Sequence, residues 1–270
     1  MGKENRGAKA ARAQAQAARA EAQLAERARE RRVRLIGGLV VVLIMGGLLA
    51  IPLLSGKNDG PATNANAKLP TGVTKDTYGV KVGPAWSAAD ADTIPLLQVW
   101  EDFQCPACKS MEDATGQTII DLANSGKIRL EWRPTIFLDG NLKSQNTAAG
   151  NADSSLRATA AFGCAVDQGK AIEFHNGIFA AQPANEGEGF SDAQLMSIAQ
   201  ANMDATQLEA FTTCMTNGDY TSWVQNSYDA FSKEGVTSTP TAFLNGKELP
   251  SDTIFDPAKL TEAITAATTS

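Results

Sequence analysis

The sequence is poor in histidine and cysteine, the residues that most often bind transition metals. It has one histidine, His175, and four cysteines among its 270 residues. A single histidine excludes a metal site built from several imidazoles of one chain. Only one Cys-x-x-Cys pair occurs, Cys105 with Cys108, whereas a zinc ribbon needs a second such pair or a pair of histidines. The sequence therefore predicts no metal site.

Positive charge is scarce outside the N-terminal segment. Residues 1–34 hold ten Lys or Arg and four Glu, a net charge of +6, whereas the whole chain has a net charge of −6. The residues after Arg34 therefore carry a net charge of −12. An acidic segment of this size repels a phosphate backbone, so we expect no nucleic-acid binding.

Charged residues are absent from 35–54, LIGGLVVVLIMGGLLAIPLL. As a helix this run is long enough to cross a hydrocarbon core of roughly 30 Å. By the positive-inside rule, the basic residues 1–34 form a cytoplasmic tail and the chain after residue 54 lies outside the cell membrane. All four cysteines lie on that side, where disulfides persist. A cleavable secretory signal is the alternative to a single-pass anchor, although its apolar core usually has only about 7–15 residues.

Residues 55–77 contain few large apolar side chains and many Gly, Pro, Asn and Thr, which predicts a flexible linker. The elements predicted after it are strands at 78–82, 94–103 and 128–138, helices at 154–168, 171–181, 191–202, 204–217 and 220–234, a hairpin at 241–249 and a helix at 257–267. This order predicts an α/β domain at 78–270 that is interrupted by an all-helical insertion at about 141–234.

Cys105 and Cys108 follow the second predicted strand directly, at the start of a helix. Unpaired N–H groups and the helix dipole favour the thiolate form of Cys105 there. Cys108 lies on the same helical face, where it can resolve a mixed disulfide. The pair therefore predicts thiol–disulfide exchange, with a structural disulfide or half of a zinc site as the alternatives.

Three segments, VWEDFQCPACK, FGCAVDQGKAIEFHNGIFAAQ and EGVTSTPTAFLNG, resemble in sequence and order the DsbA-like family of exported thiol–disulfide oxidoreductases, especially its membrane-anchored bacterial branch. The resemblance covers about 78–268. It implies a thioredoxin-like fold with a helical insertion, in which Cys105 attacks and Cys108 resolves. It also implies that Pro240 is cis and lies with Thr239 beside the cysteines, where a substrate can pair as an added strand. An ordinary trans proline that opens a strand is the alternative.

The sequence departs from this family's pattern at two places. The dipeptide between the cysteines is Pro-Ala, which lacks the histidine of the best-known strong oxidant. Val99 stands six residues before Cys105, where several thioredoxin-like proteins keep a buried carboxylate. Glu101 and Asp102 are the nearest substitutes, and at most one of them approaches the cysteines because neighbours on a strand face opposite sides. We expect neither to take a direct part in catalysis.

Cys164 and Cys214 fall on two predicted helices, 50 residues apart and among apolar neighbours. A structural disulfide between them, which anchored members of the family also have, is preferred over a second redox pair. We expect a packing or capping role for His175.

The predicted function is that of an anchored oxidase. It donates its Cys105–Cys108 disulfide to unfolded or cysteine-containing exported proteins, is reoxidised by a quinone-linked membrane partner, and needs no other cofactor. The alternatives are a reductase or isomerase of the same compartment, and a non-catalytic docking module in which both disulfides are permanent.

Overall fold

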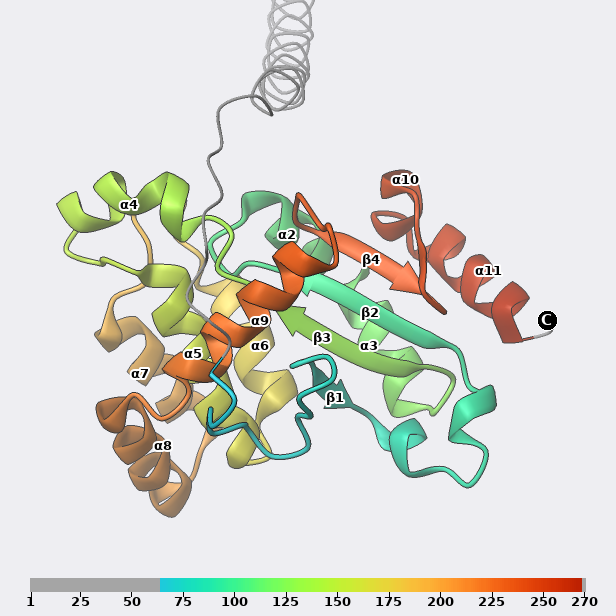
Figure 1. Cartoon of the computed structure of the whole chain (residues 1–270), viewed down its shortest axis with the longest axis horizontal. Helices are drawn as coiled ribbons and strands as arrows, with labels where there is room; N and C mark the ends of the chain where they lie inside the picture. Colours follow the sequence, from blue (N-terminus) through green and yellow to red (C-terminus); the bar gives the residue numbers. More distant parts are fainter. Residues whose placement is uncertain (1–63, 269–270) are drawn as a thin grey trace, which may run out of the picture. The chain divides into compact units, whose positions relative to one another are not determined.

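The computed structural model describes residues 64–268, and Figure 1 shows how their helices and strands are arranged. The segments 1–34 and 35–54, predicted as a cytoplasmic tail and a membrane anchor, lie outside the described residues, as does the first part of the predicted linker. Within 64–268, no helix combines the length and the apolar character needed to cross a bilayer.

The described part of the chain contains a mixed sheet of five strands, in the order β1-β3-β2-β4-β5 (Figure 1). The strands are β1 Val80–Val82, β2 Leu96–Glu101, β3 Arg129–Pro134, β4 Thr241–Leu244 and β5 Lys247–Glu248. β2 and β3 are parallel, and the other neighbouring pairs are antiparallel. β2 is therefore the central strand, and its carboxyl end leads into the segment that contains Cys105.

The central strand β2 is buried on both faces. Val99 belongs to the main hydrophobic core, whereas the next residue, Trp100, packs with Phe231 and Val236 in a smaller cluster. Successive side chains of a strand point to opposite faces, so burial of both faces requires apolar residues at consecutive positions. This explains why the segment around β2 is so rich in large apolar residues.

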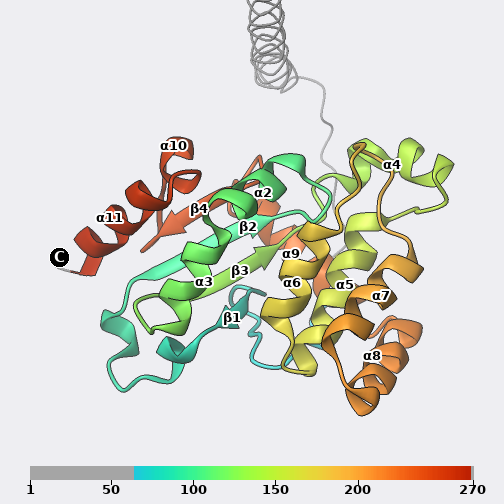
Figure 2. The same cartoon turned by 180° about the vertical axis from the view of Figure 1, so that it is seen from behind.

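A long, broken helix connects the parallel strands β2 and β3. It consists of α2 (Pro106–Met111), a π-helical turn η3 (Glu112–Gly116) and α3 (Gln117–Asn124). Parallel neighbours need such a crossover because a tight turn joins only antiparallel strands. Figure 2 shows the crossover lying over the sheet. Ile119, Ile120 and Ala123 of α3 are buried.

The predicted helical insertion corresponds to helices that mostly gather beyond one end of the sheet, and the last of them returns to pack on the sheet (Figures 1 and 2). They are α4 Asp139–Ala148, α5 Ser154–Asp167, α6 Ala171–Ala180, α7 Asp192–Asn202, α8 Ala205–Asn217 and α9 Thr221–Lys233. The bounds of α5 to α9 agree with the predicted ranges within one residue. Ser191 and Asp204 form the expected capping boxes at the starts of α7 and α8.

The remaining elements complete the sheet and its edge. Two 3-10 turns, η1 Pro84–Ser87 and η2 Ala91–Thr93, connect β1 to β2. Asn245 and Gly246 form the predicted tight turn between β4 and β5, with φ angles of 50° and 77°. The chain continues with α10 (Ser251–Ile254) and α11 (Pro257–Thr268), whose Leu260 and Ile264 are buried.

The structure corrects the predicted flexible linker at 55–77, because its described part packs against the domain. The backbone N–H of Asn64 donates to Oδ1 of Asn226 (2.8 Å), and Lys68 forms an ion pair with Asp219 (2.5 Å). Val73 is buried in the main core. The polar residues of this segment therefore bind specific partners on the helical insertion, which composition alone does not reveal.

Candidate active site

Cys105 lies where the central strand passes into the crossover helix. The carbonyl of Asp102 accepts a hydrogen bond from the N–H of Cys105 (2.9 Å), which closes a tight turn after β2. Cys105 is the N-cap residue of α2, and Pro106 is the first residue of that helix. Proline is well tolerated at this position because the N–H that it lacks would have no helical partner. The local sequence thus places the Cys105 side chain at a helix start.

The thiols of Cys105 and Cys108 are free, and their surroundings differ. Cys108 is fully buried, whereas 7% of Cys105 remains exposed. The hydrogen bond from the Cys108 thiol, together with the backbone N–H groups of Cys108 and Ala107, lowers the pKa of Cys105 from 9.0 to about 6. Burial raises the pKa of Cys108 well above 9.0. At neutral pH the arrangement therefore holds a thiolate at Cys105 and a thiol at Cys108.

Thr239 and Pro240 lie beside this pair, although 134 residues separate Thr239 from Cys105. The peptide bond between Thr239 and Pro240 is cis. Pro240 directly precedes β4, and β4 pairs with β2 so that Thr241 lies opposite Trp100. The carbonyl oxygen of Thr239 is 3.4 Å from Sγ of Cys105. The sheet therefore brings the two predicted substrate-binding residues to the predicted redox pair.

Asp102 is buried away from solvent and organises the turn before Cys105. Its carboxylate accepts hydrogen bonds from the N–H of Gln104 (2.9 Å), the N–H of Leu138 (2.9 Å) and the hydroxyl of Ser155 (2.6 Å). Burial raises its pKa to about 7. Since Ser155 belongs to α5, these bonds attach the active-site turn to the helical insertion.

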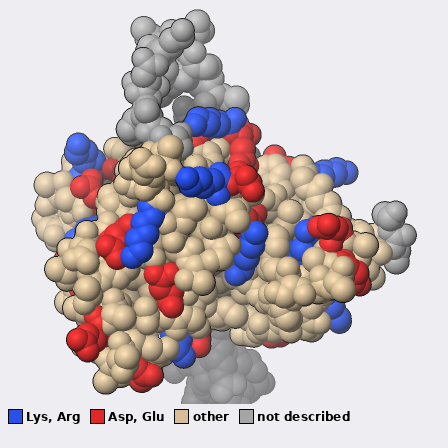
Figure 3. All heavy atoms as spheres, turned by 60° about the horizontal axis from the view of Figure 1, so that its bottom comes forward, with Lys and Arg blue, Asp and Glu red and all other residues tan. Residues whose placement is uncertain are grey.

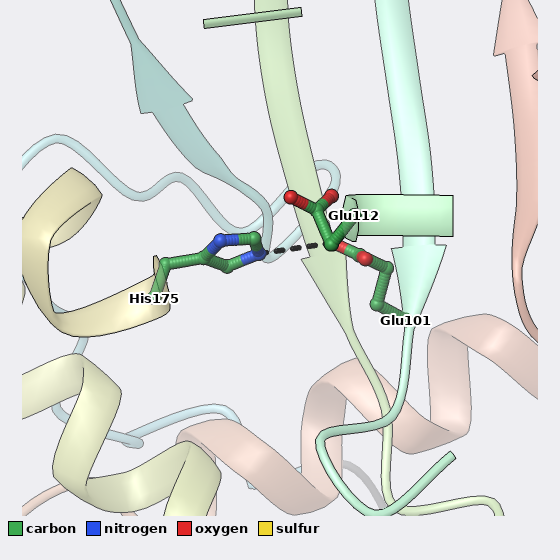
Figure 4. A group of neighbouring side chains, drawn as sticks. All are labelled: Glu101, Glu112 and His175. Atoms are coloured by element: carbon green, nitrogen blue, oxygen red, sulfur yellow. Dashed lines mark hydrogen bonds and ion pairs between the residues drawn. The ribbon is translucent and has the colours of Figure 1, made fainter. Parts of the chain in front are cut away.

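Glu101 faces His175 and Glu112 (Figure 4). Its Oε2 is 3.0 Å from Nε2 of His175, and its carboxyl group lies near that of Glu112. Burial raises the pKa of each of the two carboxyl groups to about 8. Negative charge at Cys105 contributes to the raised pKa of Glu101. The sequence reasoning did not select Glu112, although its place one helical turn after Cys108 is a usable signal.

His175 lies in an aromatic cluster, which agrees with the predicted packing role. Its ring stacks on that of Trp132, with centroids 3.8 Å apart and planes at 11°. Further ring contacts come from Phe103, Phe162 and Phe179. These contacts fix the plane of the imidazole and direct Nε2 toward Glu101.

Gln182, at the end of the second family-like segment, is a site residue that sequence reasoning missed. Its side-chain amide donates to the carbonyls of Phe103 (2.8 Å) and Cys105 (3.1 Å). Gln182 also lines a pocket of about 370 Å³ together with Gln104, Pro106 and Lys109. The loop after α6 therefore supports the backbone on which Cys105 is carried.

Cys164 on α5 and Cys214 on α8 form a disulfide, with the Cα atoms 5.8 Å apart. Cys164 is 1% exposed and Cys214 8% exposed, and both belong to the main hydrophobic core. The disulfide connects two helices of the insertion and lies on elements other than those that carry Cys105 and Cys108.

Residues 90–266 match the thioredoxin family. The fold is similar to that of the MdbA protein of Actinomyces oris, described as a thiol-disulfide oxidoreductase. That comparison has 24% identity and a TM-score of 0.60, and it covers 77% of this chain and 97% of that one. DsbA of Mycobacterium tuberculosis in its oxidised form is 25% identical, with a TM-score of 0.55 and coverages of 71% and 93%. BdbD of Bacillus subtilis, also oxidised, is 19% identical, with a TM-score of 0.57 and coverages of 76% and 100%.

No curated protein matches the chain.

Proposed function

The chain belongs to the thioredoxin family and is a thiol–disulfide oxidoreductase, and from this premise we propose that it forms disulfides in exported proteins. Cys105 and Cys108 carry the reaction and alternate between a dithiol and a disulfide. The observation that carries the proposal is the position of Cys105 at the start of α2, with Cys108 buried one turn further on and the cis Thr239–Pro240 peptide beside them.

In the proposed reaction, a thiolate of the substrate attacks Sγ of Cys105 in the Cys105–Cys108 disulfide. A new S–S bond joins substrate and Cys105, while Cys108 leaves with the electron pair of the broken bond and takes up a proton. A second substrate thiolate then attacks the substrate sulfur of this mixed disulfide and releases Cys105 as a thiolate. Two electrons have passed from the substrate to the enzyme, and the substrate holds a disulfide.

The low pKa of Cys105 makes the Cys105–Cys108 disulfide a stronger oxidant than a pair whose outer thiol has an ordinary pKa. A pKa of about 6 keeps Cys105 ionised after reduction at neutral pH. A stabilised thiolate stabilises the dithiol form, and a more stable dithiol makes the disulfide a stronger oxidant. The same low pKa makes Cys105 a good leaving group when the second substrate thiolate attacks.

Substrates bind across the surface that Thr239 and Pro240 share with Cys105. An extended substrate segment pairs with the backbone beside Pro240 as an added strand, which requires no particular side chains and suits unfolded exported proteins. On the face shown in Figure 3, basic and acidic side chains are interspersed among a larger uncharged area.

We further propose that the catalytic domain works outside the cell membrane, held there by residues 35–54 as an anchor. Support comes from the uncharged run and the basic residues before it. The dithiol formed in each cycle has to be reoxidised, and a quinone-linked membrane protein is the partner proposed for this step.

The test is oxidation of a reduced, unfolded protein by the purified full-length chain. We expect wild type to introduce disulfides, Cys105→Ser to be inactive, and Cys108→Ser to accumulate mixed disulfides through Cys105. The equilibrium of the Cys105–Cys108 pair with glutathione should give a potential nearer to about −120 mV than to about −270 mV. A potential near the lower value, with Cys105 found as a thiol in cells, would instead identify a reductase or isomerase.

A docking module without catalytic activity would give two different results. Cys105 would be alkylated slowly after mild reduction, and wild type and Cys105→Ser would oxidise the reduced protein equally.

A further inference from the structure

Glu101, Glu112 and His175 bring three potential metal ligands together from three separate elements. Glu101 ends β2, Glu112 begins the π-helical turn η3, and His175 lies on α6 (Figure 4). One carboxylate oxygen of each glutamate and one ring nitrogen of the histidine lie within 4.8 Å of one another. The exposed fraction is 3% for Glu101 and 1% for His175, so this cluster is shielded from water.

Two oxygens of the cluster lack a hydrogen-bond partner. Among the described residues, no N–H or hydroxyl group donates to Oε1 of Glu101 or to Oε1 of Glu112, although both oxygens are buried. The two carboxyl groups lie close together in a buried place, and a positive charge between them, either a proton or a metal ion, removes their mutual repulsion. A buried carboxylate oxygen without a donor is costly, and a cation removes that cost.

The local structure is built to hold Glu112 in this place. A π-helical turn inserts an extra residue into a helix and is frequent at functional sites. Gly116, at the end of this turn, has no side chain, and a Cβ atom there would collide with Oε2 of Glu112. Glu112 is the half-buried member of the cluster.

We propose that this cluster binds a divalent transition-metal ion of the zinc type through one oxygen of Glu101, one oxygen of Glu112 and Nε2 of His175. Two carboxylates and an imidazole suit such an ion, whereas calcium and magnesium prefer six or more oxygen ligands. Tetrahedral ligands at about 2.0–2.2 Å from the ion lie about 3.4 Å from one another, so the donor atoms have to approach each other by up to about 1.4 Å on binding. The prediction of no metal site was based on pairs of cysteines or histidines. It did not include two glutamates with one histidine.

The cysteines are not ligands in this proposal, because neither belongs to the group that lies within 4.8 Å. The site therefore remains available when Cys105 and Cys108 are oxidised to a disulfide. The proposal goes beyond the proposed function and is independent of it, since metal binding needs no disulfide exchange.

The chain allows a direct test because His175 is its only histidine. Full-length protein without a histidine tag, kept in detergent with Cys105 and Cys108 oxidised, is titrated with Zn²⁺ while nitrogen NMR follows the imidazole. We expect one equivalent of Zn²⁺ to move the Nε2 resonance to the position of a coordinated nitrogen. Co²⁺ should give the d–d absorption of a bound ion without a thiolate-to-cobalt charge-transfer band. An imidazole spectrum unchanged by excess Zn²⁺ would show that a shared proton alone holds the cluster, and would overturn the proposal.

Matched variants assign the remaining ligands. Glu112→Gln should weaken Co²⁺ binding by about tenfold or more, because even changes outside the ligand shell cost this much. Glu131→Gln is its control: Glu131 is buried on β3 but accepts hydrogen bonds from Thr77 and Gln98 outside the cluster. It should bind Co²⁺ like wild type. Equal binding by wild type, Glu112→Gln and Glu131→Gln would overturn the proposed ligand set.

A second pair of variants covers the case in which Glu112→Gln does not fold. Gly116→Ala displaces the Glu112 carboxylate and should weaken Co²⁺ binding in the same way. Gly140→Ala adds the same methyl group on α4, where no atom lies within 4 Å of the new Cβ. It should leave the affinity unchanged. Unchanged affinity in Gly116→Ala as well would contradict the assignment of Glu112.

Discussion

Cys105 and Cys108 are three residues apart on one turn of helix, yet their environments push their acidities in opposite directions. Cys105 gains hydrogen bonds that favour its thiolate, whereas Cys108 is desolvated and keeps its proton. A low pKa at the outer sulfur supplies the nucleophile, and a high pKa at the inner sulfur keeps the second thiol neutral. This division follows from the N-cap position of Cys105 and the burial of the residue one turn further on.

We expect the alkylation rate of Cys105 in the reduced protein to reach half its maximum near pH 6. An unperturbed thiol does so near about 8.5. Because the folded-state pKa is lowered, thiolate stabilisation of the dithiol form is complete above pH 9.0 and is lost as the pH falls through about 6. Mass spectrometry after timed exposure to iodoacetamide measures this rate.

Cys108→Ala provides the control for this prediction. It removes the hydrogen bond that contributes most to the low pKa of Cys105. The midpoint should therefore move upward, toward that of an ordinary thiol. A wild-type midpoint near pH 9 would contradict the environment described for Cys105.

At the scale of single residues, the sequence was informative where chemistry depends on local position. Cys105 and Cys108 were recognised from their place after a strand and at a helix start, without knowledge of tertiary contacts. Glu112 and Gln182 were missed because their roles depend on contacts across the fold, with Glu101 in one case and with the backbone of Cys105 in the other. The sequence alone shows only that Glu112 lies one helical turn after Cys108, and no local pattern marks Gln182.

At the scale of elements, α5 and α8 are held together by the Cys164–Cys214 disulfide. The loop-entropy estimate for a loop of this length is about 4 kcal/mol, and disulfides typically stabilise a protein by about 2–4 kcal/mol. We expect Cys164→Ala with Cys214→Ala to lower the free energy of unfolding by that amount, measured by denaturant titration. Disulfide exchange by Cys105 should persist, because the two cysteine pairs lie on different elements.

The double variant Cys105→Ala with Cys108→Ala is the matched control for the disulfide prediction, since it also removes two cysteines. It is compared with wild-type protein in which Cys105 and Cys108 are reduced. No crosslink is lost in this comparison, so the free energy of unfolding should change much less. Loss of exchange activity in folded Cys164→Ala with Cys214→Ala protein would instead favour a second redox pair.

The sequence predicted most helix ends correctly because their signals are local. Ser191 and Asp204 start helices through their own side chains, and Gly218 adopts the left-handed conformation that ends α8. No helix was predicted at the start of α4, because Leu142 and Asn146 are its only buried residues and make no apolar stripe. The π-helical turn η3 was not predicted either, because it depends on the tertiary contacts of the Glu112 side chain.

At the scale of the whole molecule, residues 64–77 form part of the folded domain. Thr71 donates from its backbone N–H and its hydroxyl to Asp167, which also binds Tyr220. This segment therefore covers one side of the helical insertion. Its composition resembles that of a linker, and only the partners on α5 and α9 distinguish it from one.

We expect a chain that begins at residue 78 to be less stable than one that begins at residue 64. The shorter chain loses the buried side chain of Val73 and the hydrogen bonds of Asn64 and Thr71. After the ordering entropy of the segment is subtracted, the expected difference is about 1–3 kcal/mol in the free energy of unfolding. Thermal and denaturant unfolding of the two truncated proteins measure it. Equal stability would restore the linker prediction for the whole of 55–77.

The disulfide between Cys164 and Cys214 also bears on how the protein matures. Under the proposed function, each new copy contains the product of the reaction that it catalyses, and is therefore a substrate of the enzyme as well as the enzyme. Cys164 and Cys214 become buried as α5 and α8 pack, so their bond has to form while the helical insertion is still open. The first copies made in a cell need an outside oxidant, and later ones can be oxidised by copies already folded. A population of this enzyme would then build up autocatalytically.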